Sequence, residues 1–396
     1  MLTMTAAAVL AALVVTPSTG SADTAARTLS VGPGGQYTTV QAAADVAQPG
    51  DTVAIAAGVY NGGLVIRHDG SPGNYITFLG VGGAAVIKGD GGSNGLIALG
   101  NHSWLRFANV TSAGSRGFGA YASGAHDLVF DNFHVDGSRD GGLVLLATAN
   151  VVVDGCDIRG TNARGTSADH EALSIGSGSS NVEVRHCLVH DNGEEGIDVK
   201  YDDNAHVIIH DNVVRNNRGP NIYVDSSSSV DIYNNVISGT TNNTKAGIGL
   251  AVEDYSDSRK LSNVKVYNNL SYGNAQAGLG MWVESTGTMS DIQIVNNTFF
   301  GNSRGSITVD ADKFSGYNLL RNNIFAEGAV SDTHFTKDHN VTGDPGFVNP
   351  AAGDFRLRPG STKAIDVGSC VAAPAFDLAG TARPTGAGFD IGAYEQ

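Results

Sequence analysis

Carboxylate, ammonium and phenol side chains recur at matching positions of short alternating segments in the middle of the chain. In chain order they are Glu171, Glu195, Asp198, Lys200, Tyr223 and Asp225. A positioned Lys or Tyr can take a proton from carbon when its surroundings tune its pKa. Carboxylates held close together repel one another unless a cation lies between them. These residue types therefore indicate proton transfer, cation binding, or both.

Two of these residues are candidates for the proton transfer itself. Lys200 would act as a base if a nearby positive charge lowered its pKa, and Tyr223 would act as a donor or a base. A lysine that only forms a surface ion pair and a tyrosine that stacks on a sugar are the plain alternatives. Arg218 lies shortly before Tyr223 and is a third catalytic candidate, because a guanidinium can hold a carboxylate with two hydrogen bonds.

The remaining polar residues suit a cation or a substrate. Hard oxygen ligands on Glu171, Glu195 and Asp198 predict a calcium site, with a solvated acidic patch as the alternative. The candidates for substrate binding are Asp225, Trp282, His170 and Arg215. Trp282 would form a platform for a sugar ring, whereas a single histidine more often has a structural role.

These candidates need a scaffold that stacks their segments, and an internal repeat predicts one. Turns centred on Asn or a similar residue recur at Asn132, Gly155, His186, Asn212, Asn235, Asn269, Asn297 and Asn323. Their intervals run from 23 to 34 residues, which is typical of a solenoid. Asn suits the turn because it tolerates the left-handed conformation and its amide can bond between neighbouring turns. A β-sandwich would need hairpin turns at shorter spacing.

Each repeat also holds a strand that follows a glycine-containing loop, and these strands align. Strict alternation turns one set of side chains inward: Leu173, Ile197, Ile222, Ile248 and Leu279. The other set turns outward and includes Asp198, Lys200 and Tyr223. Stacked strands lie about 5 Å apart, so the outward polar residues should gather within roughly 10–15 Å. The sequence thus predicts an all-β protein, a single-stranded right-handed parallel β-helix.

The two ends of the chain depart from the repeat. An apolar stretch before small residues predicts a signal peptide over residues 1–22 and a secreted, extracellular protein. An amphipathic helix over Tyr37–Ala47 is expected to cap the first coil. The β-helix is expected to span residues 23–330, with residues 331–396 as an irregular C-terminal cap region of the same domain.

Charge and cysteine content limit the partners and the cross-links. The formal net charge of −15 argues against nucleic acid and anionic membranes, and we expect a monomer. A polyanionic substrate would need local cations or a bound metal. Cys156 and Cys187 lie at matching positions of adjacent coils, roughly 5 Å apart, so a disulfide and a buried thiol pair are both open. Cys370 has no evident partner.

The coil pattern, with the opening Gly35–Ala43 and the tail Asp390–Tyr394, resembles the β-helical polysaccharide lyases over nearly the whole mature chain. The segments around Lys200 and Tyr223 are similar to those of the alginate lyases of polysaccharide lyase family 31. That resemblance implies a Lys and a Tyr acting in a cleft on the side of the helix. The step from calcium ligand to base also resembles family 6, with Arg218 as the assisting arginine. The family 9 pectate lyases share the acid-Gly-x-x-x-Lys strand, but their paired Asp on the next coil is absent here.

The resemblance implies β-elimination on an acidic, uronate-containing polysaccharide, with alginate as the first expectation and calcium as a possible cofactor. Four alternatives stay open. One is a pectate lyase, and another is a mannuronan C5-epimerase, although the Tyr-Gly-Phe-Asp-Pro-His strand of those enzymes is absent. A β-helical glycoside hydrolase would use two carboxylates such as Asp202 and Asp203. The last is a non-catalytic solenoid that binds glycans.

Overall fold

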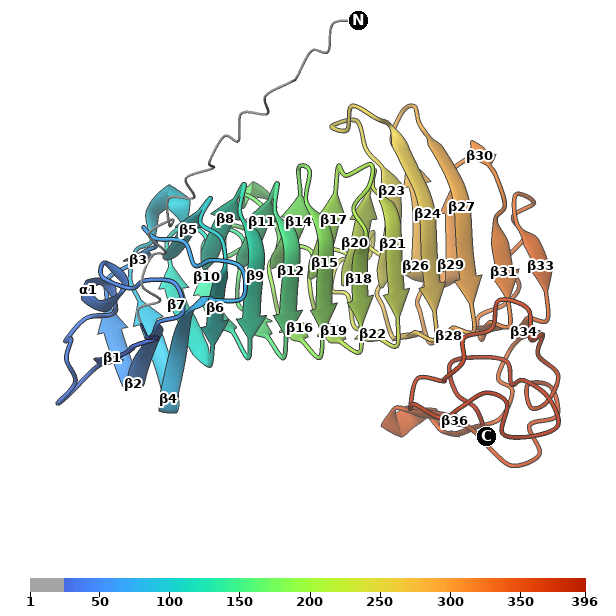
Figure 1. Cartoon of the computed structure of the whole chain (residues 1–396). Helices are drawn as coiled ribbons and strands as arrows, with labels where there is room; N and C mark the ends of the chain where they lie inside the picture. The colour runs from blue at the N-terminus through green and yellow to red at the C-terminus, as the bar shows by residue number, and fades with distance from the viewer. Residues whose placement is uncertain (1–24) are drawn as a thin grey trace, which may run out of the picture.

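The computed structural model describes residues 25–396, which form a right-handed parallel β-helix (Figure 1). The predicted fold class is therefore confirmed. The predicted signal peptide, residues 1–22, lies outside the described residues. Within residues 25–396 no helix has the length and apolarity needed to cross a bilayer.

Three columns of parallel strands run along the solenoid, and each coil adds one strand to a column. The first column consists of β1 (Thr28–Val31), β2 (Thr52–Asn61), β4 (Ile76–Lys88), β6 (Leu105–Ala108), β9 (His126–Asp131), β12 (Ala149–Asp154), β15 (Ser180–Arg185), β18 (Val207–His210), β21 (Ser228–Tyr233), β24 (Lys260–Tyr267), β27 (Thr288–Val295), β30 (Phe314–Ser315), β31 (Leu319–Arg321) and β33 (Thr336–Asp338). The second consists of β7 (Val110–Ser115), β10 (His134–Ser138), β13 (Asp157–Arg159), β16 (Leu188–His190), β19 (Val213–Arg215), β22 (Val236–Ser238), β25 (Leu270–Tyr272), β28 (Thr298–Phe300), β32 (Ile324–Phe325) and β34 (Val341–Thr342).

The third column is a separate ten-stranded sheet, which we call the site sheet because the candidate residues lie on it. Its strands are β3 (Leu64–Val65), β5 (Ile97–Gly100), β8 (Ala120–Ser123), β11 (Leu143–Leu146), β14 (Leu173–Gly176), β17 (Ile197–Lys200), β20 (Ile222–Asp225), β23 (Ile248–Val252), β26 (Ala277–Val283) and β29 (Gly305–Asp310). The inward column predicted from alternation is confirmed. Ile197, Ile222 and Ile248 pair in register and are fully buried.

The turn between the first two columns uses both residues of each Asn pair, for different purposes. The first residue adopts the left-handed conformation, as Asn234 does with φ 53° and Asn268 with φ 54°. The second residue extends a ladder of buried amides along the helix axis. The Asn235 side chain donates to the Asn269 Oδ1 at 3.0 Å, and the Asn269 side chain donates to the Asn297 Oδ1 at 3.0 Å. This division of roles explains why Asn occurs twice in succession at residues 234–235, 268–269, 296–297 and 322–323.

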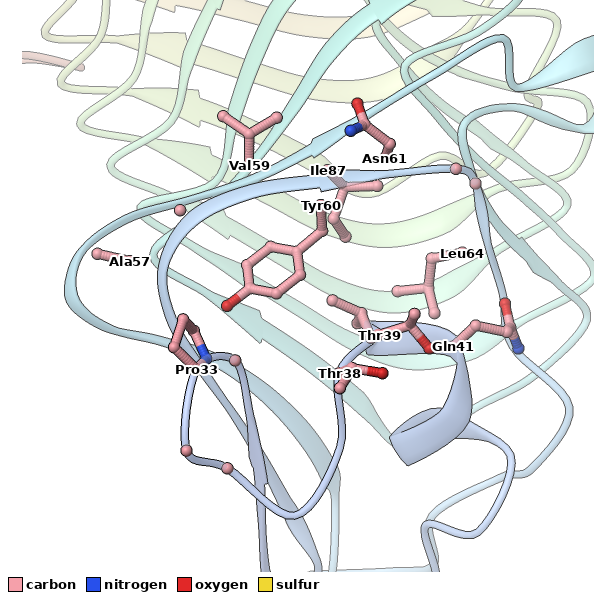
Figure 2. Close-up of a pocket in the computed structure, with 17 residues that line it drawn as sticks. Pro33, Thr38, Thr39, Gln41, Ala57, Val59, Tyr60, Asn61, Leu64 and Ile87 are labelled. Carbon is pink, nitrogen blue, oxygen red and sulfur yellow. The ribbon is translucent and has the colours of Figure 1, made fainter.

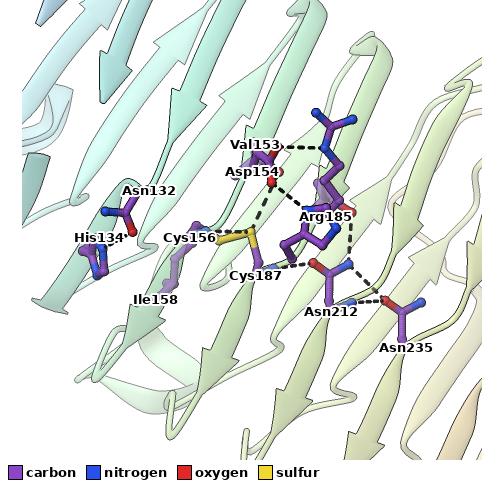
Figure 3. The surroundings of a disulfide bond; sticks show 12 residues. Asn132, His134, Val153, Asp154, Cys156, Ile158, Arg185, Cys187, Asn212 and Asn235 are labelled. Atoms are coloured by element: carbon purple, nitrogen blue, oxygen red, sulfur yellow. Dashed lines mark hydrogen bonds and ion pairs between the residues drawn. A yellow bond between two sulfur atoms is a disulfide. The ribbon is translucent and has the colours of Figure 1, made fainter. Parts of the chain in front are cut away.

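The predicted cysteine pair occupies the same turn column as the ladder. Cys156 and Cys187 form a disulfide with their Cα atoms 4.4 Å apart. Figure 3 shows the bridge beside Asn212, whose Oδ1 accepts a hydrogen bond from the Cys187 backbone N–H at 2.9 Å. The alternative of a buried thiol pair is therefore not what the structure has. Cys370 is exposed and unbridged.

The ends of the helix differ in detail from the expectation. The N-terminal helix α1 covers only Val40–Ala44, with Thr39 as its N-cap and Asp45 as its C-cap. The remaining short elements are η1 (Gly92–Asn94), η2 (Gly165–Ser167), η3 (Pro350–Ala352), β35 (Phe347–Asn349) and β36 (Asp354–Leu357). Parallel pairing continues through β34, beyond the boundary expected at residue 330. The tail then packs beside the last coils in the second column (Figure 1).

Candidate active site

Strand register brings most of the predicted site residues together on the outer face of the site sheet. Ser174, Asp198, Tyr223 and Gly249 follow one another in one row. Gly176, Lys200, Asp225, Ala251 and Trp282 form the next row. Glu171 and Glu195 precede their strands at matching positions, since Gly142 bonds to the Glu171 carbonyl and Ala172 to the Glu195 carbonyl. The grouping was predictable because parallel strands keep one register along the solenoid.

This outer face is much less exposed than an open polar surface would be. Tyr223 is 5% exposed, and Asp198 and Asp225 are each 1% exposed. Side chains of neighbouring coils cover one another here. The Tyr223 ring lies over Gly249 and stacks on Trp282, with ring centroids 5.4 Å apart and planes 12° apart. Burial on this scale makes every charge on the face sensitive to its immediate partners.

Lys200 is held as an ammonium ion by two carboxylates. Its Nζ lies 2.6 Å from both Glu171 carboxylate oxygens and 3.3 Å from the Asp198 Oδ2. Burial alone would lower the pKa of Lys200, but the charges of Asp198 and Glu171 outweigh it and raise that pKa. For Glu171, burial raises the pKa, and the Lys200 charge and hydrogen bonds outweigh it and lower that pKa. Lys200 is therefore protonated at neutral pH and cannot act as a base in this state.

The three predicted calcium ligands do not converge on a common point. No group of three or more Asp, Glu, His or Cys side chains among residues 25–396 has the arrangement of a metal site. The Lys200 ammonium instead lies between Glu171 and Asp198. The Asp198 Oδ1 is buried without a hydrogen-bond partner. Calcium stays a prediction, and its test is the melting temperature of the protein with and without a chelator.

Two carboxyls on this face have pKa values near neutrality. Burial, followed by the charge of Glu171, raises the pKa of Glu195 to about 7. Burial, followed by the charge of Glu253, raises the pKa of Asp225 to about 7. Groups with such pKa values exchange protons readily at neutral pH.

Glu253 is a site residue that the sequence analysis missed. The Tyr223 hydroxyl donates a hydrogen bond to Glu253 Oε1. Burial first, and then the Asp225 and Glu253 charges, raise the pKa of Tyr223 well above its usual value. Glu253 follows directly after β23, outside the aligned strand positions. Glu253 could have been identified from its position, because it lies one coil beyond Asp225, the acidic residue that ends the neighbouring strand β20.

Arg218 and His170 lie beside residues of the site sheet, whereas Arg215 does not. Arg218 pairs with Glu194 at 2.9 Å, beside Glu195 at the edge of the site sheet. Arg215 ends β19 in the second column and lies 3.9 Å from Asp191, so the structure does not bring it to the site sheet. The His170 Nδ1 lies 3.5 Å from the Ser174 hydroxyl. Burial, followed by the Lys200 charge, lowers the pKa of His170.

A hollow at the N-terminal end of the β-helix has fewer groups that can transfer protons than the site sheet has. It measures about 580 Å³ and lies between the glycine-rich segment Gly32–Gly35 and β2 (Figure 2). Its one ionisable side chain is Tyr60, whose hydroxyl donates to the Ala56 carbonyl at 2.8 Å. The site sheet, not this hollow, collects the groups that can transfer protons.

Comparisons with known proteins agree with the fold. A sequence profile described as "Right handed beta helix region" matches residues 73–237, and a comparison with curated protein sequences finds no match. The solved pectate lyase Pel9A superposes with a TM-score of 0.55 at 16% identity, over 93% of this chain and 96% of its own. A PL6 family polysaccharide lyase from Pseudopedobacter saltans superposes with a TM-score of 0.52 at 14% identity, over 81% and 94%. At such identities the likeness shows a shared right-handed β-helix fold.

Proposed function

We propose that this chain is a secreted polysaccharide lyase that cleaves a uronate-containing polysaccharide by β-elimination. The observation that carries the proposal is the buried cluster on the site sheet, where Lys200 donates hydrogen bonds to Glu171 and the Tyr223 hydroxyl donates to Glu253. Two solved structures that share the fold are named as a pectate lyase and a PL6 family polysaccharide lyase, which supports this class. Alginate is the first substrate to test, in keeping with the resemblance to family 31.

The contacts of Tyr223 suggest how a neutral tyrosine can act as the base. The C5–H bond of the uronate breaks, and its proton moves to the Tyr223 oxygen as the Tyr223 hydroxyl proton moves to Glu253. The electron pair released at C5 forms a double bond to C4, and the C4–oxygen bond breaks. The departing oxygen takes a proton from Lys200, whose carboxylate partners keep it protonated. This assignment keeps Lys200 and Tyr223 as catalytic residues but makes Lys200 the acid.

The activity is tested by following the absorbance of unsaturated uronate ends in a screen of alginate, pectate, glucuronan and glycosaminoglycans. We expect one uronan to give unsaturated product. A change in uronate composition without unsaturated ends would indicate an epimerase instead. Retention on a uronan without either product would indicate a binding protein.

The role of the tyrosine is tested by Tyr223→Phe, which keeps the ring and its stacking on Trp282 but removes the hydroxyl. We expect turnover to fall by at least about a hundredfold, the usual share of a positioned proton-transfer group. Tyr267→Phe is the matched control, because Tyr267 stacks on Tyr233 on the first strand column, away from the site sheet. Near-full activity of Tyr223→Phe on an otherwise accepted substrate would remove Tyr223 from the mechanism.

A further inference from the structure

A polar hollow lies beside the proposed proton-transfer residues, where the loop that precedes β23 meets β26 and β29 of the site sheet. Its volume is about 220 Å³, and its lining residues are Thr244, Lys245, Ala246, Gln276, Gly280, Met281, Trp282, Thr308 and Asp310. Trp282 forms one wall and stacks with its ring on Tyr223. Trp282 therefore belongs both to the wall of the hollow and to the stack with Tyr223.

The hollow exists because the outer row of the sheet has two successive glycines before it reaches Thr308 on β29. After Asp198 and Tyr223 the row continues as Gly249 and Gly280. A Cβ at Gly249 would lie 2.8 Å from the Tyr223 ring and 2.9 Å from the Trp282 ring, so glycine is needed for the stack. A Cβ at Gly280 would meet Ala246 at 3.1 Å and Thr308 at 3.4 Å, which means that Gly280 leaves the floor of the hollow open.

Lys245 supplies a cation at this hollow with only a distant ionic partner. Its Nζ lies 3.9 Å from the nearest carboxylate oxygen, on Glu195, and 5.9 Å from the centre of the Trp282 ring. The other two cations of the face hold their carboxylates much closer, Lys200 at 2.6 Å and Arg218 at 2.9 Å. The Lys245 charge is therefore available to an anionic ligand.

The backbone around Lys245 is fixed before any ligand arrives. The Lys245 N–H donates to the Asn242 carbonyl at 3.0 Å, and its carbonyl accepts from the Thr240 hydroxyl at 3.0 Å. The remaining polar groups suit sugar hydroxyls. The Gln276 amide and the Thr308 hydroxyl lie 3.4 Å apart across the floor, and Asp310 lies at the exposed end. An ammonium, an indole face and neutral hydrogen-bonding groups around one small hollow fit a single acidic sugar.

We propose that this hollow binds one uronate residue of the polysaccharide, with Lys245 holding its carboxylate and Trp282 packing against its ring. The inference rests on the proposed function, because it assigns the substrate position next to Tyr223. The charge of the substrate carboxylate is then met by Lys245, which leaves the Lys200 ammonium for the departing oxygen. Asp310 faces the end of the sugar away from Lys245 and accepts from its hydroxyls.

The test measures binding directly, by affinity electrophoresis in gels that contain alginate, pectate or carboxyl-reduced alginate. We expect Lys245→Gln to weaken retention on a uronan about tenfold and to leave retention on the carboxyl-reduced polymer unchanged. Lys245→Arg keeps the charge and should retain most of the binding. Lys265→Gln is the matched control, because it removes an equal charge away from the hollow. Lys265 lies on the first strand column, 3.8 Å from Asp231.

Three results would overturn the inference. The first is a Lys245→Gln protein that binds the uronan as tightly as wild type, and the second is an equal loss on the acidic and neutral polymers. The third is a wild-type protein that binds none of the uronans. The outcome is separable from that of the lyase assay, because charge-dependent binding through Lys245 without unsaturated product would contradict the lyase proposal alone. Gly280→Ala adds a second variant, which should weaken uronan binding by filling the floor.

Discussion

A lysine buried beside two carboxylates is chemically different from a lysine in water. The position of Lys200 on the outer face was predictable from strand alternation, but its protonation was not, because it depends on how far Glu171 reaches across the coil. The same holds for Tyr223, whose hydroxyl partner Glu253 lies outside the aligned strands. Sequence spacing therefore predicted which residues meet, whereas side-chain conformation decides what each can do.

The buried carboxyls lead to a prediction about stability and pH. The pKa of Glu195 is about 7 in the folded chain against an ordinary 4.5, so the folded state binds more protons between these values. Stability should therefore fall as the pH rises through this window, by about 3 kcal/mol for such a shift. Glu195→Gln removes this loss, and it should be more stable than wild type at pH 8 but not at pH 4.

The measurement is chemical denaturation across that pH range. Asp312→Asn serves as the control, because Asp312 is exposed and its removal should leave the pH profile unchanged. A Glu195→Gln profile parallel to that of wild type would show that Glu195 is charged in the folded protein at neutral pH.

At the scale of the strand, alternation and register are set by the backbone, and this explains why they were predictable. Side chains alternate across a strand, and parallel coils carry that pattern from one strand to the next without a shift. What alternation does not predict is the depth of the outer face. Gly249 leaves room for the Tyr223 and Trp282 rings to stack over the outer face, and such packing depends on tertiary contacts.

The inward column gives a sharp test of register. Ile222 is fully buried between Ile197 and Ile248, so Ile222→Asp places a carboxylate among apolar side chains. Burial of an unpaired charge costs several kcal/mol, and we expect the variant not to fold. Ile208→Asp makes the same change on β18 at a side chain that is 38% exposed, and it should fold. Circular dichroism melts compare the two, and a cooperative transition for Ile222→Asp would show that the register is wrong.

At the scale of the whole molecule, the solenoid is a row of coils that contact only their neighbours, and the tail departs from that rule. It crosses several coils at once. Asn296 donates to the Asp390 carbonyl at 3.0 Å, Asn322 donates to the Ser369 carbonyl at 2.8 Å, and Arg383 reaches Asn268 at 3.2 Å. These contacts use asparagines of the coil turns, so one part of the repeat both shapes the coils and holds the tail. An irregular tail was predictable because the sequence repeat stops before it. The place where the tail docks was not predictable, because no repeat specifies it.

Arg383 is the residue on which this docking should depend. Its side chain is fully buried, pairs with the equally buried Glu395 at 2.7 Å, and donates to the Gly392 carbonyl at 2.9 Å. Arg383→Ala leaves Glu395 buried without its cation, which typically costs 3–5 kcal/mol. We expect the tail after β34 to become the first site of proteolytic cleavage, while the coils persist as a resistant core. Arg356→Ala is the control within the same tail, because Arg356 pairs with Asp354 at the surface and its loss should leave cleavage unchanged. Equal resistance of the Arg383→Ala and wild-type tails would mean that apolar contacts of Phe347 and Ile391 hold the tail without the buried ion pair.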